Sequence, residues 1–281
     1  MEPIAAARQL IELALDEDIG TGDLTALAVP PDTRTHARLI AKEACVLSCM
    51  ELAPLVLEVF GADAEFKINF ADGTFVEKGA TIFEATGRAR DLLTTERTLL
   101  NFLQRTCGIA TQARRFKEAL GGAELCILDT RKTTPGLRYW EKKAVKDGGL
   151  SNHRQRLDEA VLLKENHIRA SGSIRLALAN LQGKIPAGTL VEVEVTNWEE
   201  AKEALDCEMK RLLLDNFSPA DARTLVAKIR DYRREVYLEA SGGITLDNVR
   251  SYAGLGLDAV SAGALTHSVK AADLSFLFQT Q

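Results

Sequence analysis

The sequence has few cysteines and no pattern that would put them to chemical use. Its five cysteines are an odd number and include no Cys-x-x-Cys pair, which argues against a disulfide framework and against a zinc site. We therefore expect reduced thiols that mostly serve in packing. Blocks of like charge are also absent, and the net charge is −5. A general affinity for nucleic acid or for an anionic membrane is not expected from this balance.

Long apolar runs and the commonest catalytic motifs are absent as well. No stretch approaches the length of a membrane span, and the N-terminal stretch carries acids where a secretory signal would have basic residues and an apolar core. We expect a cytoplasmic protein. The sequence contains no GxxxxGK[ST] or GxGxxG motif, which removes the commonest nucleotide-binding interpretations. No GxSxG or HExxH motif occurs either. Any site must therefore be built from less familiar elements.

The first third of the chain has an irregular pattern. A helix is expected near residues 4–16, followed by short alternating segments around 36–48, 64–70 and 74–86 that indicate a small antiparallel sheet. From Arg90 to about Leu120 the apolar spacing becomes helical, and Arg97 lies on its polar stripe. We predict a first domain over residues 1–115, with the tail of about 268–281 packing back on it, and a second domain over 116–267.

The remainder contains short apolar runs separated by loops or helix-like segments. Six runs recur, "LCILD", "AVLLK", "LVEVEV", "RLLLD", "VYLEAS" and "LDAVSAG", beginning at residues 125, 160, 190, 211, 236 and 257. Buried strands alternating with crossovers indicate a parallel α/β architecture. Their spacing favours a barrel over an open sheet, although the sequence alone leaves both open.

Each of these runs ends in or just before residues that can bind or ionise. In order they are Asp129 with Arg131 and Lys132 beyond it, Lys164, Glu194, Asp215, Ser241, and Ser261 with Gly263. In a parallel barrel all strands open on one face, so these groups would converge on one mouth. Any one of them could be an exposed loop residue or a cap, but six in succession favour an enzyme.

Cations gather along the first two strand ends and the loop that joins them. They are Arg131, Lys132, Arg138, His153, Arg154 and Lys164. Arginine matches carboxylates in a bidentate manner and lysine supplies a point charge. This half-site therefore suits a small substrate with more than one carboxylate, or a phosphate. Alone, His153 would more often be a structural hydrogen-bonding residue, but its position beside Arg154 favours a role in the site.

Acidic residues follow on the next two strands. In "LVEVEV" the alternation sends Glu192 and Glu194 to one face, where we expect them to point into the barrel. With Asp215 on the next run, Glu194 forms a pair that could hold Mg²⁺ through oxygen ligands or water, bridging a diphosphate. The alternative is that Glu192 and Glu194 only balance nearby cations.

Two glycine-containing turns follow the last two strands. "ASGGI" contains Gly242 and Gly243, and "SAGALTHS" contains Gly263. Backbone amides freed by these glycines at helix N-termini would form a phosphate cradle of the kind common at this position in barrels. The expected site is therefore cationic on one side, acidic on another and suited to phosphate on a third.

Together these segments resemble the quinolinate phosphoribosyltransferase family. The resemblance rests on "EDIGTGDLT", "TERTLLNFLQRTCGIAT", "LDTRKTTPGLR", "GGLSNHR", "LLKENHI", "EVEV", "LLLDNF", "EASGGI" and "LDAVSAGALTHS", in order along almost the whole chain. It implies an N-terminal α/β sandwich joined to an incomplete α/β barrel, and a homodimer or higher homo-oligomer whose paired subunits complete each other's sites. The implied reaction joins quinolinate to phosphoribosyl diphosphate with Mg²⁺ and yields nicotinate mononucleotide, diphosphate and CO₂, a step in NAD biosynthesis.

The resemblance also implies roles for single residues. Quinolinate would be held by Arg131, His153, Arg154 and Lys164, with Arg97 reaching in from the partner subunit. Phosphoribosyl diphosphate and its metal would be held by Thr130, Lys132, Glu194, Asp215, Ser241, Gly242, Gly243, Ala262, Gly263 and Ala264. We expect Lys164, Glu194 and Asp215 to be catalytic: Lys164 in the decarboxylation or the protonation that follows, and an acid in steadying positive charge at the anomeric carbon. Glu194 and Asp215 would bind the metal directly or through water.

Two other functions remain as alternatives. One is a phosphoribosyltransferase-like paralogue associated with molybdenum transport, which keeps the "RKTTPG" region but is less faithful in the substrate half. The other is a catalytically silent barrel that binds anions. The intact "NHR" and "LLKENH" segments favour quinolinate over the first, and the presence of Glu194 and Asp215 beside the cations weighs against the second.

Overall fold

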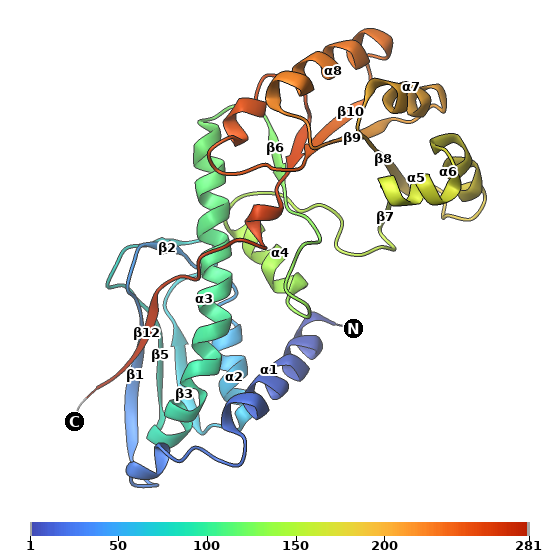
Figure 1. Cartoon of the computed structure of the whole chain (residues 1–281). Helices are drawn as coiled ribbons and strands as arrows, with labels where there is room; N and C mark the ends of the chain where they lie inside the picture. Colours follow the sequence, from blue (N-terminus) through green and yellow to red (C-terminus); the bar gives the residue numbers. More distant parts are fainter. Residues whose placement is uncertain (1, 280–281) are drawn as a thin grey trace. The chain divides into compact units, whose positions relative to one another are not determined.

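The computed structural model describes residues 2–279, which divide into two compact units (Figure 1). The first unit contains the chain up to Arg114, Thr133–Gly149 and the residues from Ser268 onward. The second contains Arg115–Lys132 and Leu150–His267. Compactness does not by itself define a folding domain, so the limits 1–115 and 116–267 stay a prediction.

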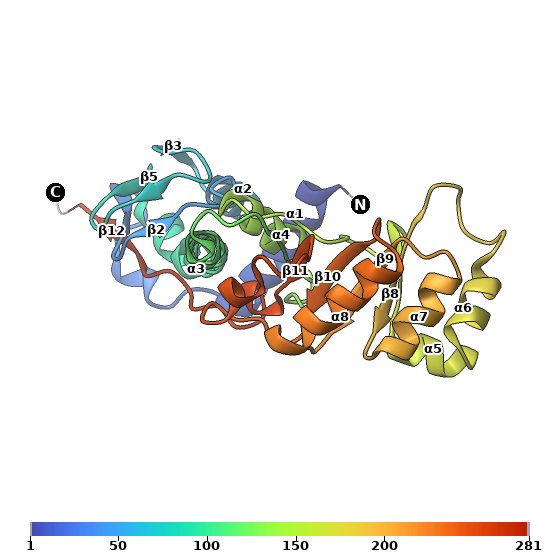
Figure 2. The same cartoon turned by 90° about the horizontal axis from the view of Figure 1, so that it is seen from above.

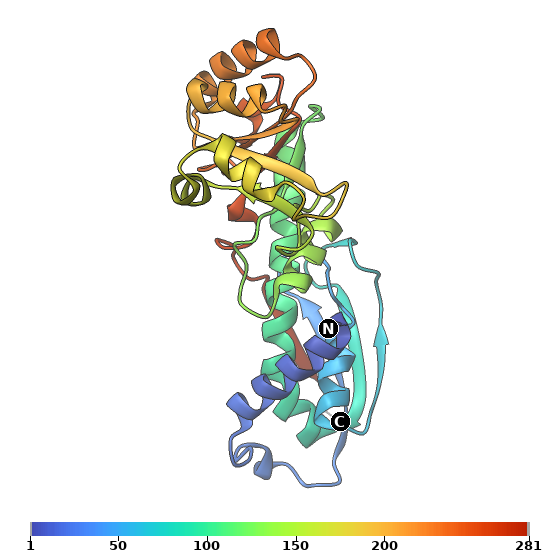
Figure 3. The same ribbon diagram turned by 90° about the vertical axis from the view of Figure 1, so that its right-hand side faces the viewer.

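The first unit is an antiparallel sheet packed with helices. The sheet has the order β12-β1-β5-β3, formed by β1 (Arg34–Ala41), β3 (Ala64–Ile68), β5 (Thr81–Arg88) and β12 (Leu274–Phe278), and a small second sheet pairs β2 (Cys45–Val46) with β4 (Phe75–Val76). The helices are α1 (Pro3–Ile19), the 3-10 turn η1 (Ala26–Ala28), α2 (Leu52–Phe60), α4 (Arg138–Asp147) and α3 (Ala89–Leu120), which continues into the second unit. Figure 3 shows α1 and α2 side by side, and residues of both helices share a hydrophobic core with the sheet.

Apolar spacing explains these elements. Helix α1 buries Ala7, Ile11 and Leu15, which recur every four residues and so share one face. Strand β1 buries every second residue in the same core, with Leu39 fully inaccessible. The helix expected near 4–16 and the helix expected over about 90–120 are both confirmed.

The second unit is built on a six-stranded parallel sheet. Its order is β6-β11-β10-β9-β8-β7, from β6 (Cys126–Leu128), β7 (Ala160–Leu163), β8 (Leu190–Val195), β9 (Arg211–Asp215), β10 (Tyr237–Ser241) and β11 (Ala259–Ser261). All six strands expected from the apolar runs are confirmed. Strands β6 and β7 form the two edges and do not pair, so the sheet is a barrel left open between its first two strands, as the resemblance implied.

Helices cover the outer face of this sheet. They are α5 (Glu165–Ser171), α6 (Ile174–Leu181), α7 (Trp198–Asp206) and α8 (Pro219–Tyr232), and Figure 2 shows α6, α7 and α8 along one side of the strands. Under them lie fully buried apolar side chains such as Val193, Leu212 and Leu238. Residues one position away, including Glu192 and Glu239, take the other face. The alternation of "LVEVEV" thus sends its valines outward and its glutamates inward, as expected.

One part of the sequence interpretation is wrong. We expected helix N-termini directly after both glycine turns, but Gly242 and Gly243 lead into a loop, and the next element is only the 3-10 helix η2 (Val249–Tyr252). The second turn opens the single-turn 3-10 helix η3 (Gly263–Leu265). Asn248 accounts for the first case, because its side-chain oxygen accepts the Thr245 N–H and its amide donates to the Gly243 carbonyl. Such local bonds compete with a regular helix.

A helix that spans a membrane must be both long and apolar. No helix within residues 2–279 is both long enough and apolar enough to cross a bilayer.

Candidate functional site

The strand register places polar side chains in one row at the open end of the barrel. Asp215 pairs with Ser241 across β9 and β10, and Ser241 pairs with Ser261 across β10 and β11. The Ser241 hydroxyl donates to Asp215 Oδ1 at 2.8 Å. Side chains in register on neighbouring strands share a face, so three of the predicted strand-end groups do converge.

The gap between β6 and β7 is spanned by a short irregular segment, residues 151–154. Ser151 makes a parallel bridge to Leu128 of β6, and Arg154 Nη1 donates to the carbonyl of Ala160 on β7. Fully buried Asp129 holds the middle of the segment: its Oδ1 accepts the His153 N–H at 2.9 Å, and its other oxygen accepts the Asn152 amide. A buried carboxylate is tolerated because it receives these hydrogen bonds.

Two of the predicted cations lie close enough to influence each other. Burial, and next the positive charge of Arg131, lower the pKa of Arg154, while Glu192 acts in the opposite direction. Two guanidinium groups held near one another favour an anion that can meet both. Such a setting suits an anion with two carboxylates.

Lys164 and Glu194 face each other across β7 and β8. Lys164 is the N-cap residue of α5, and its Nζ lies 3.4 Å from Glu194 Oε2. The other oxygen of Glu194 accepts the Glu165 N–H at 3.3 Å, so the start of α5 and the end of β8 are tied together. Lys164 is exposed, whereas Glu194 is buried. The pair therefore presents an accessible ammonium group above a carboxylate.

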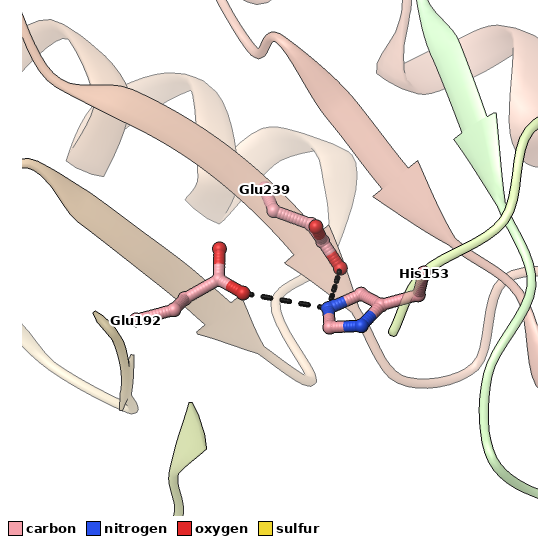
Figure 4. A group of neighbouring side chains, drawn as sticks. All are labelled: His153, Glu192 and Glu239. Carbon is pink, nitrogen blue, oxygen red and sulfur yellow. Dashed lines mark ion pairs between the residues drawn. The ribbon is translucent and has the colours of Figure 1, made fainter. Parts of the chain in front are cut away.

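A second acidic pair lies on the inner face of the barrel, facing His153 (Figure 4). His153 Nε2 is 3.4 Å from Glu192 Oε2 and 3.7 Å from Glu239 Oε1. Glu192 also lies 3.9 Å from Arg211, whose guanidinium is stacked 3.6 Å from the ring centre of Tyr237. The cluster thus joins three strands to the irregular segment.

Glu239 is the most strongly perturbed acid of this cluster. Its side chain is fully buried, and neither of its oxygens has a hydrogen-bond partner among residues 2–279. Burial, and next the charge of Glu192, raise the pKa of Glu239 to about 7, and His153 opposes the shift. The carboxyl group therefore takes up a proton near neutral pH.

The glycine turns bring the backbone close to neighbouring groups. Gly242 has φ +86°, and a Cβ there would lie 2.8 Å from Asn216 Cα, so the turn requires glycine. A Cβ on Gly263 would lie 3.1 Å from Lys132 Cδ and 2.8 Å from His267 Cδ2. The Thr266 hydroxyl donates to the Lys132 carbonyl, which ties η3 to the loop after β6. Lys132 and Gly263 are therefore neighbours, as a shared phosphate site requires.

The remaining predicted residues fall into two groups. Thr130, Gly243, Ala262 and Ala264 belong to the same turns, and the Thr130 hydroxyl accepts the Lys132 N–H. Arg97 and Arg138 belong to the first unit. Arg97 is exposed on α3, and Arg138 Nε donates to the Thr133 hydroxyl. Their roles stay predictions.

Sequence reasoning missed one residue of the site and expected a different role for another. Glu239 was hidden inside "VYLEAS", where only its alternation with Leu238 and Ala240 could have indicated an inward carboxylate. Asp129 was expected at the mouth of the barrel as a binding group, but its oxygens are occupied by the segment 151–154. That contact joins residues far apart in the chain, and no local pattern could have predicted it.

Two family models match consecutive parts of the chain. The family model "Quinolinate phosphoribosyl transferase, N-terminal domain" matches residues 23–107, and the C-terminal domain of the same family matches residues 109–277. The chain belongs to the quinolinate phosphoribosyltransferase family.

Relatives within this family cover nearly the full length. The nicotinate-nucleotide pyrophosphorylase [carboxylating] of Mycobacterium leprae is 40% identical over 275 residues, which cover 96% of each chain. A probable enzyme of the same name from Synechocystis is 37% identical over 250 residues, 89% of this chain and 85% of the relative. The solved nicotinate-nucleotide pyrophosphorylase of Francisella tularensis is 38% identical, with a TM-score of 0.91 over 99% of this chain and 98% of that one.

The buried carboxyl group of Glu239 gives a prediction about stability. Because its pKa is raised from 4.5 to about 7, the folded chain binds a proton that the unfolded chain releases between these values, so this group makes stability fall as pH rises. In Glu239→Gln this cost is absent. We expect the free energy of unfolding of the variant to exceed that of the wild type by about 2 kcal/mol at pH 8, with a much smaller difference at pH 5.

Urea unfolding at the two pH values measures this difference. Glu235→Gln, just before the same strand and exposed, is the matched control and should show no pH-dependent difference. A gain for Glu239→Gln that is equal at pH 5 and pH 8 would contradict the prediction.

Proposed function

We propose that the chain transfers the phosphoribosyl group of phosphoribosyl diphosphate to quinolinate with loss of one carboxylate, giving nicotinate mononucleotide, diphosphate and CO₂ in NAD biosynthesis. The observation that carries the proposal is the Lys164–Glu194 ion pair at the strand ends, in the same unit as Arg131 and Arg154. The carboxylating activity named for relatives at 37–40% identity supports it. The enzyme is thus a pentosyltransferase.

The cationic half of the mouth suits quinolinate. A pyridine with two neighbouring carboxylates needs two positively charged partners, and Arg131 and Arg154 provide guanidinium groups for them. Lys164 adds an exposed ammonium group from the next strand end. His153 lies between these groups and the barrel interior.

The acidic and glycine-rich half suits phosphoribosyl diphosphate. Lys132 lies beside Gly263 and offers a positive charge next to the backbone of this turn, and the turn after Ser241 requires the glycine at position 242. Glu194 and Asp215 end neighbouring strands on the inner face, and carboxylate oxygens are the ligands that Mg²⁺ prefers. These residues fit the ion, which when bound would neutralise the diphosphate as it leaves.

The side chains of the site have distinct tasks in the reaction. The arginines fix the ring so that its nitrogen faces the anomeric carbon, and Glu194 or Asp215 steadies positive charge there. After the nitrogen is quaternised, the departing carboxylate leaves an electron pair on the carbon beside a cationic nitrogen, and that carbon then takes a proton. Lys164, held by Glu194 at 3.4 Å, is our candidate for assisting this step.

We also propose a homodimer in the cytoplasm. Arg97 is exposed on α3, where a second copy of the chain could receive it. All five cysteines are free thiols, which agrees with a reducing compartment.

The two alternative functions are less well supported. A silent anion-binding barrel has no need for the Lys164–Glu194 pair beside Asp215 and Ser241. The role in molybdenum transport is less well supported because a relative that matches 96% of this chain is named as a carboxylating pyrophosphorylase.

A product assay tests the function directly. Purified protein with quinolinate, phosphoribosyl diphosphate and Mg²⁺ should form nicotinate mononucleotide and CO₂ in equal amounts, and removing the ion with a chelator should stop the reaction. Failure with quinolinate, together with turnover of nicotinate in its place, would overturn the proposal.

Substitutions of the cations test the assignment of the mouth. Arg131→Ala and Lys164→Ala should each lower kcat/KM by about 100-fold or more, because charged hydrogen bonds to substrate are lost. Lys202→Ala is the control, since Lys202 is paired with Asp206 on the exposed face of α7. Equal losses in all three variants would show that the cationic cluster is misassigned.

Mixing of subunits tests the role of Arg97. If subunits share sites, a heterodimer of Arg97→Ala and Arg131→Ala chains has one intact site, so random reassociation of the two inactive variants should restore about one quarter of wild-type activity. Each variant alone should stay inactive. No recovery from a mixture in which heterodimers have formed would show that Arg97 acts within its own chain or not at all.

A further inference from the structure

We propose that Glu192 and Glu239 are positioning residues that act through the His153 ring on Arg154, and so determine how tightly the site binds a pyridine dicarboxylate. The inference rests on the proposed function for the identity of that ligand. It rests on four contacts of this chain for everything else.

The first contact fixes the tautomer of His153. The backbone N–H of Arg154 donates to His153 Nδ1 at 2.8 Å, so this nitrogen must offer its lone pair. In the neutral ring the proton is therefore on Nε2. Both ring nitrogens are thus engaged within the chain, and His153 supports Arg154 instead of offering a nitrogen to the substrate.

The second and third contacts hold the protonated nitrogen. Nε2–H faces Glu192 on β8 and Glu239 on β10, at 3.4 and 3.7 Å (Figure 4). Both carboxylates are buried and belong to strands fixed by the parallel sheet. The sheet therefore sets the position of the ring through two independent points.

His153, Glu192 and Glu239 are residue types that could bind a metal ion together. The tautomer of His153 argues against such a site. Their ligand atoms lie within 4.8 Å of one another. A nitrogen that carries a proton has no lone pair for a metal, and Nδ1 could carry the proton instead only by losing its bond from Arg154. The geometry favours a positioning cluster in which the two acids attract the Nε2–H of the ring electrostatically.

The fourth contact carries the effect to the substrate side. Arg154 lies in a segment without regular secondary structure, held at its backbone by His153 and at Nη1 by the Ala160 carbonyl. Asp129 fixes the same segment from β6. Removing Glu192 or Glu239 would loosen the His153 ring and with it the backbone of Arg154. The strand ends and glycine turns would stay in place.

Steady-state kinetics with each substrate varied separately test the proposal. Glu239→Leu, which removes the carboxyl group at similar volume, should raise KM for quinolinate about tenfold and change KM for phosphoribosyl diphosphate less than twofold. Glu239→Gln keeps a polar group of the same shape facing the ring and should recover most of the loss. Glu192→Gln provides a second variant if Glu239→Leu fails to fold, and it should raise the quinolinate KM in the same selective way. Glu235→Leu is the control before the same strand.

A spectroscopic readout separates positioning from a general structural defect. With only four histidines in the chain, the side-chain nitrogen resonances of His153 can be assigned by ¹⁵N NMR, using His153→Asn as the reference. We expect the Nε2–H tautomer in the wild type and a mixture of tautomers in Glu239→Leu. This measurement needs no substrate, so its result stands even if the proposed reaction is not observed.

Three results would overturn the proposal. One is an equal rise in both KM values in Glu239→Leu. Another is an Nδ1–H tautomer in the wild type. The third is stoichiometric binding of added Zn²⁺ or Mn²⁺ that is lost in Glu239→Gln, which would make the cluster a metal site.

Discussion

The geometry of the site depends on the buried carboxylate of Asp129. The barrel is open between β6 and β7, and the residues that fill the opening have no strand of their own to fix them. Asp129 accepts hydrogen bonds from the backbone of His153 and the side chain of Asn152, so the first residue after β6 determines where the segment 151–154 lies. The segment 151–154 thereby closes the gap between β6 and β7 in a defined position, although it is not a strand.

The inner face of the barrel sheet carries charged side chains, whereas the outer face is apolar. Apolar residues such as Val193 and Leu212 stabilise the sheet from the outside, under the helices. The inner face can then carry Glu192, Glu239 and Arg211, whose burial is costly unless they are paired. Placing these groups below the mouth lets the sheet fix the ring of His153 from behind. The same face ends in Asp215 and Ser241, on the side proposed for the sugar phosphate.

Much of this arrangement follows from the sequence, because strands and strand ends are encoded locally. The run "LVEVEV" predicts both a strand and the inward direction of its glutamates, and "RLLLD" places Asp215 at the mouth. The role of Asp129 could not be predicted, because its partners lie more than twenty residues away and depend on how the gap closes. No helix begins at the Gly242–Gly243 turn, since Asn248 satisfies the backbone there, and the turn at Gly263 opens only a single 3-10 turn. The tautomer of His153 depends on a backbone N–H whose direction only the fold sets.

The most direct test of the account is to follow each carboxylate of the substrate. Quinolinate labelled with ¹³C in the carboxylate beside the ring nitrogen is incubated with phosphoribosyl diphosphate and Mg²⁺, and the same is done with the label in the other carboxylate. The account predicts that the first label leaves entirely as CO₂, in proportion to the diphosphate formed, and that the second stays in the nucleotide. Release of the second label, or formation of diphosphate without CO₂, would contradict it.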